Sequence, residues 1–301
     1  MTEPMQPNPV KKGITMCTVF VKNTSKGMLA ARNHSWTQPG GSVHFVPRRR
    51  LYGKMVHALY LMDQWGQDRP FEGINEHGLF IGAAGIPDDL SPLGKQIPKP
   101  HDMDFCGIIR FVLERAKSTV EALQIFRSIP IQYDLKGKPD TVGYNVRCHF
   151  MVADPSGHAV NWADEKNCFT RRLAQGKGFP ITNFPLSFKA ADCNRYPILK
   201  KGMADVRGSA SAMKLLEKAT QPTTLWSSVY DLKRLSVELC IDLDFGFKFN
   251  FDFREKIAEG EKHLNFGELR LWEGYGHPRE KEYSIPHNIY HTAEQLKKNK
   301  S

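Results

Sequence analysis

The alternation of apolar and polar residues predicts short strands at the start of the chain. Residues 16–21 and 28–33 both have a strand pattern, and the turn cluster Asn23-Thr24-Ser25-Lys26-Gly27 lies between them. Two short strands around a glycine-containing turn are typical of a β-hairpin. The same kind of pattern predicts further strands over residues 42–47, 55–62 and 79–85.

A helical pattern follows these strands. Apolar residues recur at 3.6-residue spacing, which predicts one amphipathic helix over residues 104–117. The string Ser118-Thr119-Val120-Glu121 is a capping box that begins a second helix, which continues to about Ser128 before Pro130. Residues 131–144 are polar and contain glycine and proline, which indicates a loop.

Strand patterns return in the second half of the chain. We expect strands over residues 147–153, 158–163, 224–230 and 234–241, and a helix over residues 209–218. Phenylalanines at every second position from Phe245 to Phe253 predict another strand with one aromatic face. Strands, then helices, then strands joined by hairpins predict an α+β fold with antiparallel sheets.

Length and composition restrict the class of protein. The 301 residues allow one large domain or two, and because there is no repeat or convincing linker we expect a single domain over residues 17–301. Residues 1–16 have the composition of a leader without structural patterning, and the tail from about residue 275 is polar. No apolar run is long enough to span a bilayer and the start lacks a signal-like apolar segment, so we expect a cytoplasmic protein.

The net charge of +10 invites a nucleic-acid hypothesis. Arg48-Arg49-Arg50 is the only tight basic triplet in the body of the chain, so this hypothesis is the weakest and we expect no nucleic-acid partner. The sequence also lacks nucleotide-binding loops, an H-E-x-x-H motif and a G-x-S-x-G motif. The six cysteines include no C-x-x-C pair, which argues against a zinc site, and nothing indicates another metal or a cofactor.

Cys17 differs from the other cysteines because of its neighbours. If the chain began at Cys17, one residue would carry a nucleophilic thiol and an α-amine that can act as its general base. The predicted hairpin brings Arg32 near Cys17, where a guanidinium can stabilise a thiolate or a substrate carboxylate. Asn183, at a predicted strand end, is a suitable oxyanion donor. Taken alone, each of these residues also has an ordinary packing, surface or turn interpretation.

Six short motifs occur in a fixed order and include these residues. They are Met16-Cys17-Thr18, Ala31-Arg32-Asn33, Gly73-Ile74-Asn75-Glu76-His77-Gly78-Leu79, Ala153-Asp154-Pro155-Ser156-Gly157, Ile181-Thr182-Asn183 and Leu225-Trp226-Ser227-Ser228-Val229-Tyr230-Asp231-Leu232. From Met16 to Phe253 the chain resembles the choloylglycine hydrolase and penicillin V acylase family and the related acyl-CoA:6-aminopenicillanic acid acyltransferases.

The resemblance implies a fold and a set of site residues. The fold is an αββα four-layer sandwich, and Cys17 is the nucleophile, freed by removal of what precedes it. Arg32 would lie beside the nucleophile and Asn183 in the oxyanion hole. Arg195 stands where the family has a second active-site arginine, although a surface position at a helix start is an equal alternative.

Two positions depart from the family pattern. Ser35 stands where the family has an aspartate that holds the α-amine of the nucleophile, and a serine supplies no negative charge. Gly85 stands where the family often has Asn or Tyr. Its backbone N–H can still serve the oxyanion, so Ser35 and Gly85 are both candidates for substrate or oxyanion binding.

The implied activity is hydrolysis of a linear acyl amide through an acyl-Cys17 thioester. The alternatives are an acyltransferase that uses the same thioester and a binding protein weakened in catalysis by Ser35. Cys17 becomes N-terminal either by autocatalytic cleavage of residues 1–16 or by translation from Met16, and we favour the second route. The basic charge suits an anionic small-molecule substrate, no membrane partner is expected, and the resemblance allows a homo-oligomer.

Overall fold

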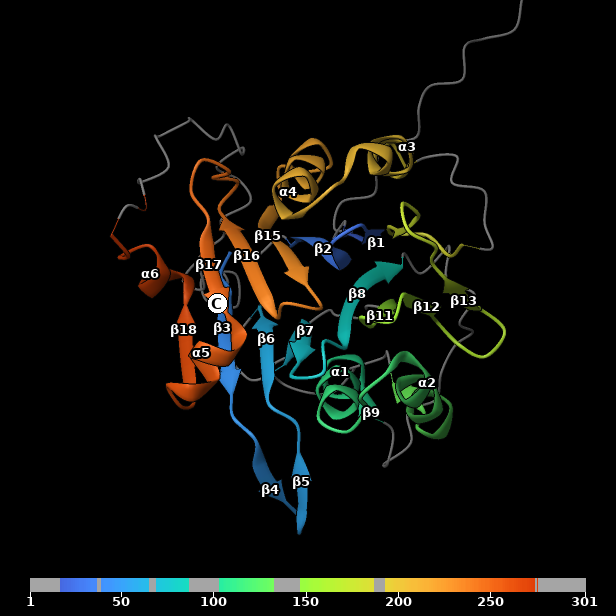
Figure 1. Ribbon diagram of the computed structural model, residues 1–301, viewed down its shortest axis with the longest axis vertical. Coiled ribbons are helices and arrows are strands. Elements are labelled where there is room, and N and C mark those ends of the chain that lie inside the picture. Colours follow the sequence, from blue (N-terminus) through green and yellow to red (C-terminus); the bar gives the residue numbers. More distant parts are fainter. Residues whose placement is uncertain are drawn as a thin grey trace, which may run out of the picture.

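Two antiparallel sheets lie face to face in the computed structural model, and each carries helices on its outer side (Figure 1). The structure describes residues 17–36, 39–64, 69–86, 103–132, 147–186, 193–273 and 275. The predicted leader and nearly all of the predicted tail lie outside the described residues.

The first sheet has six strands. In spatial order they are β14 (Gly178–Ile181), β1 (Thr18–Thr24), β2 (Gly27–Ser35), β15 (Thr224–Asp231), β16 (Ser236–Ile241) and β17 (Phe249–Asp252). The predicted hairpin at the start of the chain is β1 and β2, which pair antiparallel. Its two outer ends are adjacent, since Val19 is opposite Arg32 and Thr18 is opposite Asn33.

The second sheet has eight strands. In spatial order they are β13 (Cys168–Arg172), β12 (His158–Trp162), β11 (Arg147–Ala153), β8 (Phe80–Ile86), β7 (Pro70–Asn75), β6 (Leu59–Asp63), β3 (Ser42–Val46) and β18 (Lys262–Asn265). Two small sheets pair β4 (Arg49–Leu51) with β5 (Lys54–Val56) and β9 (Met103–Asp104) with β10 (Ile131–Gln132). The β4–β5 hairpin extends away from the body of the protein (Figure 1).

Six α-helices are described. They are α1 (Phe105–Leu113), α2 (Thr119–Ser128), α3 (Arg195–Gly202), α4 (Ser209–Lys218), α5 (Phe253–Ala258) and α6 (Phe266–Leu269). In Figure 1, α3 and α4 lie over the six-stranded sheet, and α1 and α2 lie on the opposite side of the molecule against the eight-stranded sheet. The predicted αββα arrangement of layers is therefore confirmed.

Three apolar clusters fill the three interfaces between these four layers. Along β2, Met28 and Ala30 point to the cluster between the sheets, whereas Leu29 and Ala31 point to the cluster beneath α3 and α4. A strand covered on both faces is buried at almost every position, as β2 is from Met28 onward. This alternation also decides which polar side chains of β2 reach the space between the sheets.

Several predicted elements have different ends in the structure. The strand predicted over residues 55–62 is two strands, β5 and β6, separated by His57 and Ala58. The phenylalanine run forms a strand only over β17, because Asp252 accepts from the N–H groups of Arg254 and Glu255 and so begins helix α5 at Phe253. The helix predicted to reach residue 117 ends at Leu113. There the Asn75 amide donates to the Leu113 and Ala116 carbonyls at 2.9 and 2.7 Å.

The turn between β7 and β8 requires glycine at position 78. Gly78 has a φ of +78°, and a Cβ there would lie 2.1 Å from the backbone oxygen of Leu232, which follows β15 in the other sheet. The motif Asn75-Glu76-His77-Gly78 therefore closes a hairpin of one sheet directly against a turn of the other.

Replacing Gly78 with alanine should lower the free energy of unfolding by about 3 kcal/mol, from backbone strain and this steric overlap together. Gly53 provides a matched control, since its φ is +79° and a Cβ added there would meet no atom within 4 Å. Gly53→Ala should cost only about 1 kcal/mol. Urea unfolding of both variants measures the difference, and equal losses would show that the contact with Leu232 contributes nothing.

Candidate active site

Cys17 lies immediately before β1 and belongs to the cluster between the two sheets, with only 3% of its surface exposed. Its sulfur accepts from Arg32 Nη2 at 3.5 Å, and His34 Nδ1 lies 4.0 Å from the same sulfur. The hairpin pairing predicted from the sequence thus brings Arg32 to Cys17. A buried guanidinium at this distance stabilises negative charge on the sulfur.

Arg32 is completely buried and connects the two sheets. Its Nε donates to the carbonyl of Ala83 in β8 at 3.0 Å, and its Nη2 also contacts His34 Nδ1 at 2.8 Å. Its Nη1 lies 3.5 Å from Glu72 Oε2, and both side chains of this ion pair have no exposed surface. These contacts fix the plane of the guanidinium beside Cys17.

Glu72 supplies the negative charge that a buried arginine needs. Its other oxygen, Oε1, accepts from Trp226 Nε1 at 2.6 Å and from the Ser228 hydroxyl at 2.8 Å, both on β15. These two hydrogen bonds and the ion pair with Arg32 compensate for the burial of the carboxylate. The motif that contains Trp226 and Ser228 therefore acts on the site through Glu72.

Arg195 is buried at the start of α3, with 2% of its surface exposed, which excludes the surface alternative. Its Nη1 donates to the backbone oxygen of Cys17 and to the Thr18 hydroxyl, the second at 2.9 Å. Its Nη2 donates to Asn183 Oδ1 at 2.8 Å. Burial lowers the pKa of Arg195, but an arginine remains charged at neutral pH.

Asn183 joins Arg195 to the eight-stranded sheet. Its Nδ2 donates to the carbonyl of Gly85 in β8 at 2.6 Å. The structure thus brings Gly85 to the site, where its carbonyl contacts the Asn183 amide. The amide of Asn183 is oriented by a donor on one side and an acceptor on the other.

His34, like Glu72, is a residue of this site that the sequence interpretation missed. It lies two positions after Arg32 on β2, so both side chains point between the sheets. Ser35 points to the other face, where its hydroxyl is 2.9 Å from Thr224 Oγ1. The structure therefore does not bring Ser35 to Cys17. Residues two apart on a strand share a face, and this rule applied to Arg32 would have identified His34 as a site residue.

The imidazole of His34 has a defined protonation state. Gln64 Nε2 donates to the Gly40 carbonyl at 3.2 Å, so its Oε1 faces His34 Nε2 at 2.8 Å and accepts the proton there. Burial, and next the charge of Arg32, lower the pKa of His34 well below its usual value, although the Gln64 hydrogen bond raises it. The ring is therefore neutral, with the lone pair of Nδ1 directed at Arg32.

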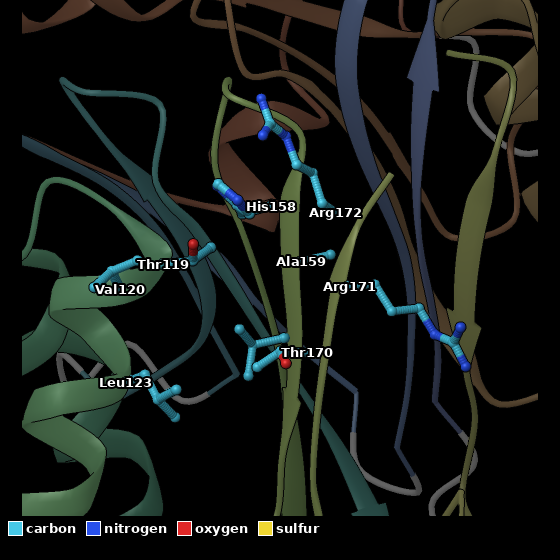
Figure 2. A pocket seen from close by; sticks show the side chains of 9 residues that line it. Thr119, Val120, Leu123, His158, Ala159, Thr170, Arg171 and Arg172 are labelled. Atoms are coloured by element: carbon cyan, nitrogen blue, oxygen red, sulfur yellow. The ribbon is translucent and has the colours of Figure 1, made fainter. Parts of the chain in front are cut away.

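Two other features lie apart from Cys17. His57, Glu76 and His77 are the one group of potential metal ligands in the described part of the chain, and Arg48 Nε donates to both oxygens of the Glu76 carboxylate at 2.7 and 2.6 Å. A surface pocket lies between α2 and strands β12 and β13 (Figure 2). Its lining residues are Thr119, Val120, Leu123, His158, Ala159, Val160, Thr170, Arg171 and Arg172, and none of them is a site residue named above.

Comparison with known proteins identifies the fold. Neither a protein-family model nor a curated protein matches the sequence. A mutant of conjugated bile acid hydrolase from Clostridium perfringens is similar in structure, with a TM-score of 0.61, 15% identity, and coverage of 83% of this chain and 96% of that one. A second variant of the same hydrolase has a TM-score of 0.59 at 15% identity, over 83% of this chain and 96% of the other.

Penicillin V acylase from Agrobacterium tumefaciens has a TM-score of 0.53 and 14% identity, over 83% of this chain and 90% of that one. At these identities the likeness shows that the chain shares the fold of these enzymes. The resemblance drawn from six short motifs is thus confirmed at the level of the fold. Separately, none of the described helices has the length and apolar character to cross a membrane.

The interior histidines make folding stability depend on pH. Buried His149 donates from Nε2 to the carbonyl of Thr182 at 2.6 Å and accepts at Nδ1 from Asn161 at 3.1 Å, which supports the strand end that carries Asn183. Burial lowers the pKa of His149 to about 4, although both hydrogen bonds raise it. Between that value and the ordinary value of about 6.5, only the unfolded chain binds the proton.

Acidification therefore favours the unfolded state across this window. From pH 7 to pH 5, His149 alone should remove about 2 kcal/mol of the free energy of unfolding. The variant His149→Gln keeps an N–H donor but does not titrate, so it should lose about 2 kcal/mol less than the parent over the same interval. Urea unfolding at both pH values tests this, and identical losses in the two proteins would contradict it.

Proposed function

We propose that this protein is an amide hydrolase in which the thiol of Cys17, as the N-terminal residue, attacks a linear acyl amide. The observation that carries the proposal is the placement of Cys17 Sγ 3.5 Å from a buried guanidinium, with the Cys17 backbone oxygen held by a second one. A cysteine that served only to fill the core would need neither charge. The shared fold with a bile acid hydrolase and a penicillin acylase supports the same class of reaction.

The reaction begins with proton transfer from the Cys17 thiol to the α-amine of the same residue. The sulfur then forms a bond to the acyl carbonyl carbon, and the carbonyl oxygen becomes an oxyanion. Arg32 stabilises the thiolate before attack because its Nη2 already points at the sulfur. The α-ammonium gives its proton to the leaving nitrogen as the C–N bond breaks, which leaves an acyl-Cys17 thioester and a free amine.

Water then hydrolyses the thioester, with the α-amine again acting as the base. It loses a proton to the α-amine, adds to the thioester carbonyl and expels the Cys17 thiolate, which releases the carboxylic acid. If an amine replaces water at this step, the same site is an acyltransferase. Access to the thioester decides whether water or an amine is the acceptor. The test below therefore measures both the released amine and the released acid.

Asn183 and Gly85 are assigned to the oxyanion. Their hydrogen bond of 2.6 Å and the bond from Arg195 to Asn183 hold the amide in one orientation before substrate binds. Preorganised donors of this kind stabilise a developing negative charge more than mobile ones do. The net charge of +10 favours an acyl amide with a carboxylate or sulfonate on its leaving part, such as a bile salt, penicillin V or an N-acyl amino acid.

The activity requires an amine at Cys17, so the N-terminus belongs to the test. The natively expressed protein is first mapped by mass spectrometry, where we expect a terminus at Cys17. The panel of conjugated bile salts, penicillin V and N-acyl amino acids is then assayed for released amine and acid. Cys17→Ala should reduce the rate of every active substrate to below about a thousandth of the parent rate.

A matched control is Cys168→Ala, which removes a half-exposed cysteine far from the site on β13. This variant should keep the parent rate. An acyl adduct on the Cys17 peptide of the parent protein, trapped by acid quench, would support the thioester. Full activity with an intact Met1 terminus, or turnover that survives Cys17→Ala, would overturn the mechanism, and no turnover with the terminus at Cys17 would favour a binding protein.

A further inference from the structure

The inference concerns His34 and rests on the proposed role of Cys17. His34 is completely buried, lies in the same space as Arg32 and Cys17, and has no part in the reaction steps above. Its ring is stacked on Trp226 with centroids 3.8 Å apart and contacts Phe71 at a centroid distance of 4.8 Å. A polar side chain fixed this firmly inside a core needs a function for its polar atoms.

We infer that His34 is a positioning residue that acts through Arg32, by accepting a hydrogen bond from Arg32 Nη2 and so directing that nitrogen at the sulfur of Cys17. The distances between these three side chains support this role. Nη2 is 2.8 Å from His34 Nδ1 and 3.5 Å from Cys17 Sγ, whereas Nδ1 and Sγ are 4.0 Å apart. Arg32, rather than the thiol, makes the short contact with the imidazole.

Gln64 determines which ring nitrogen of His34 carries the proton. Its amide orientation is set by the Gly40 carbonyl, and it therefore accepts a hydrogen bond from His34 Nε2. A neutral imidazole carries one proton, so the lone pair is placed at Nδ1, where Arg32 needs an acceptor. Without Gln64, the proton could move to Nδ1, and an N–H there would oppose the N–H of Arg32.

His34 is unsuited to be the base that takes the thiol proton. The side chains around it that carry charge or titrate are Arg32, Cys17 and, beyond Arg32, Glu72. Its other neighbours, Gln64, Trp36, Phe71 and Trp226, carry no charge. An imidazolium would face the guanidinium at 2.8 Å in a buried space, which is strongly unfavourable. The neutral acceptor avoids this repulsion and leaves proton transfer to the α-amine.

Alkylation of Cys17 by iodoacetamide tests the inference without knowledge of the substrate. The rate is measured between pH 6 and 9 on the protein with its mapped terminus, and peptide mass spectrometry separates Cys17 from the other thiols. His34→Asn places a carbonyl oxygen near the position of Nδ1 and does not titrate. It should keep the rate within about threefold and leave the pH profile unchanged, whereas His34→Leu should lower the rate at least about tenfold.

Gln64→Leu provides a second variant that leaves the histidine in place, in case His34→Leu does not fold. Because this variant no longer holds the His34 proton at Nε2, it should also slow alkylation of Cys17. Urea unfolding confirms that the variant is folded. Equal loss in His34→Asn and His34→Leu would overturn the positioning role in favour of a proton acceptor. Parent rates in His34→Leu and Gln64→Leu would show that His34 has no influence on Cys17.

These outcomes are distinct from failure of the proposed function. If Cys17 of the parent protein reacts no faster than Cys168 and no acyl adduct forms, the nucleophile assignment fails together with the inference. If Cys17 is the fast thiol and turns over an amide, but is insensitive to His34 and Gln64, only the inference fails. The two hypotheses are therefore separated by measurements on the same set of variants.

Discussion

The buried ion pair between Arg32 and Glu72 is the interaction on which the rest of the site depends. The two side chains come from different sheets, β2 and β7, and neither has any exposed surface. A buried pair adds little net stability, but removal of either partner leaves an isolated charge in the interior and is costly. Glu72 also accepts hydrogen bonds from Trp226 and Ser228, so the stacking of the sheets and the position of the guanidinium beside Cys17 form one arrangement.

The parts of this arrangement that are local in sequence could be predicted. The hairpin that brings Arg32 to Cys17 follows from two strand patterns and a turn, and the capping serine of α2 accepts from Glu121 as its motif indicates. The layered fold followed from the order of elements together with the resemblance. Element ends were less predictable, because contacts from distant segments set them, as the Asn75 amide does for the last turn of α1.

The parts that depend on long-range pairing could not be predicted from patterns along the chain. Glu72 and Gln64 meet the site only because β6 and β7 lie opposite β2, and nothing near them in sequence marks a partner. Ser35 was selected by linear comparison with a family motif, although the alternation along β2 turns it toward Thr224. For Arg195, sequence alone left a surface role and a site role equal. Burial in the folded protein separates them.

The charges of the assembled site explain why a neutral histidine suits position 34. Arg32 is paired with Glu72, whereas Arg195 donates to the neutral oxygens of Cys17, Thr18 and Asn183. Two guanidinium groups and one carboxylate thus leave one positive charge to be balanced. In the proposed mechanism, the thiolate formed when Cys17 gives up its proton lies beside this charge, and the oxyanion does so after attack. A carboxylate at position 34 would neutralise this charge in advance, and a protonated imidazole would add a second one. A neutral acceptor leaves the unbalanced charge to act on the reacting atoms.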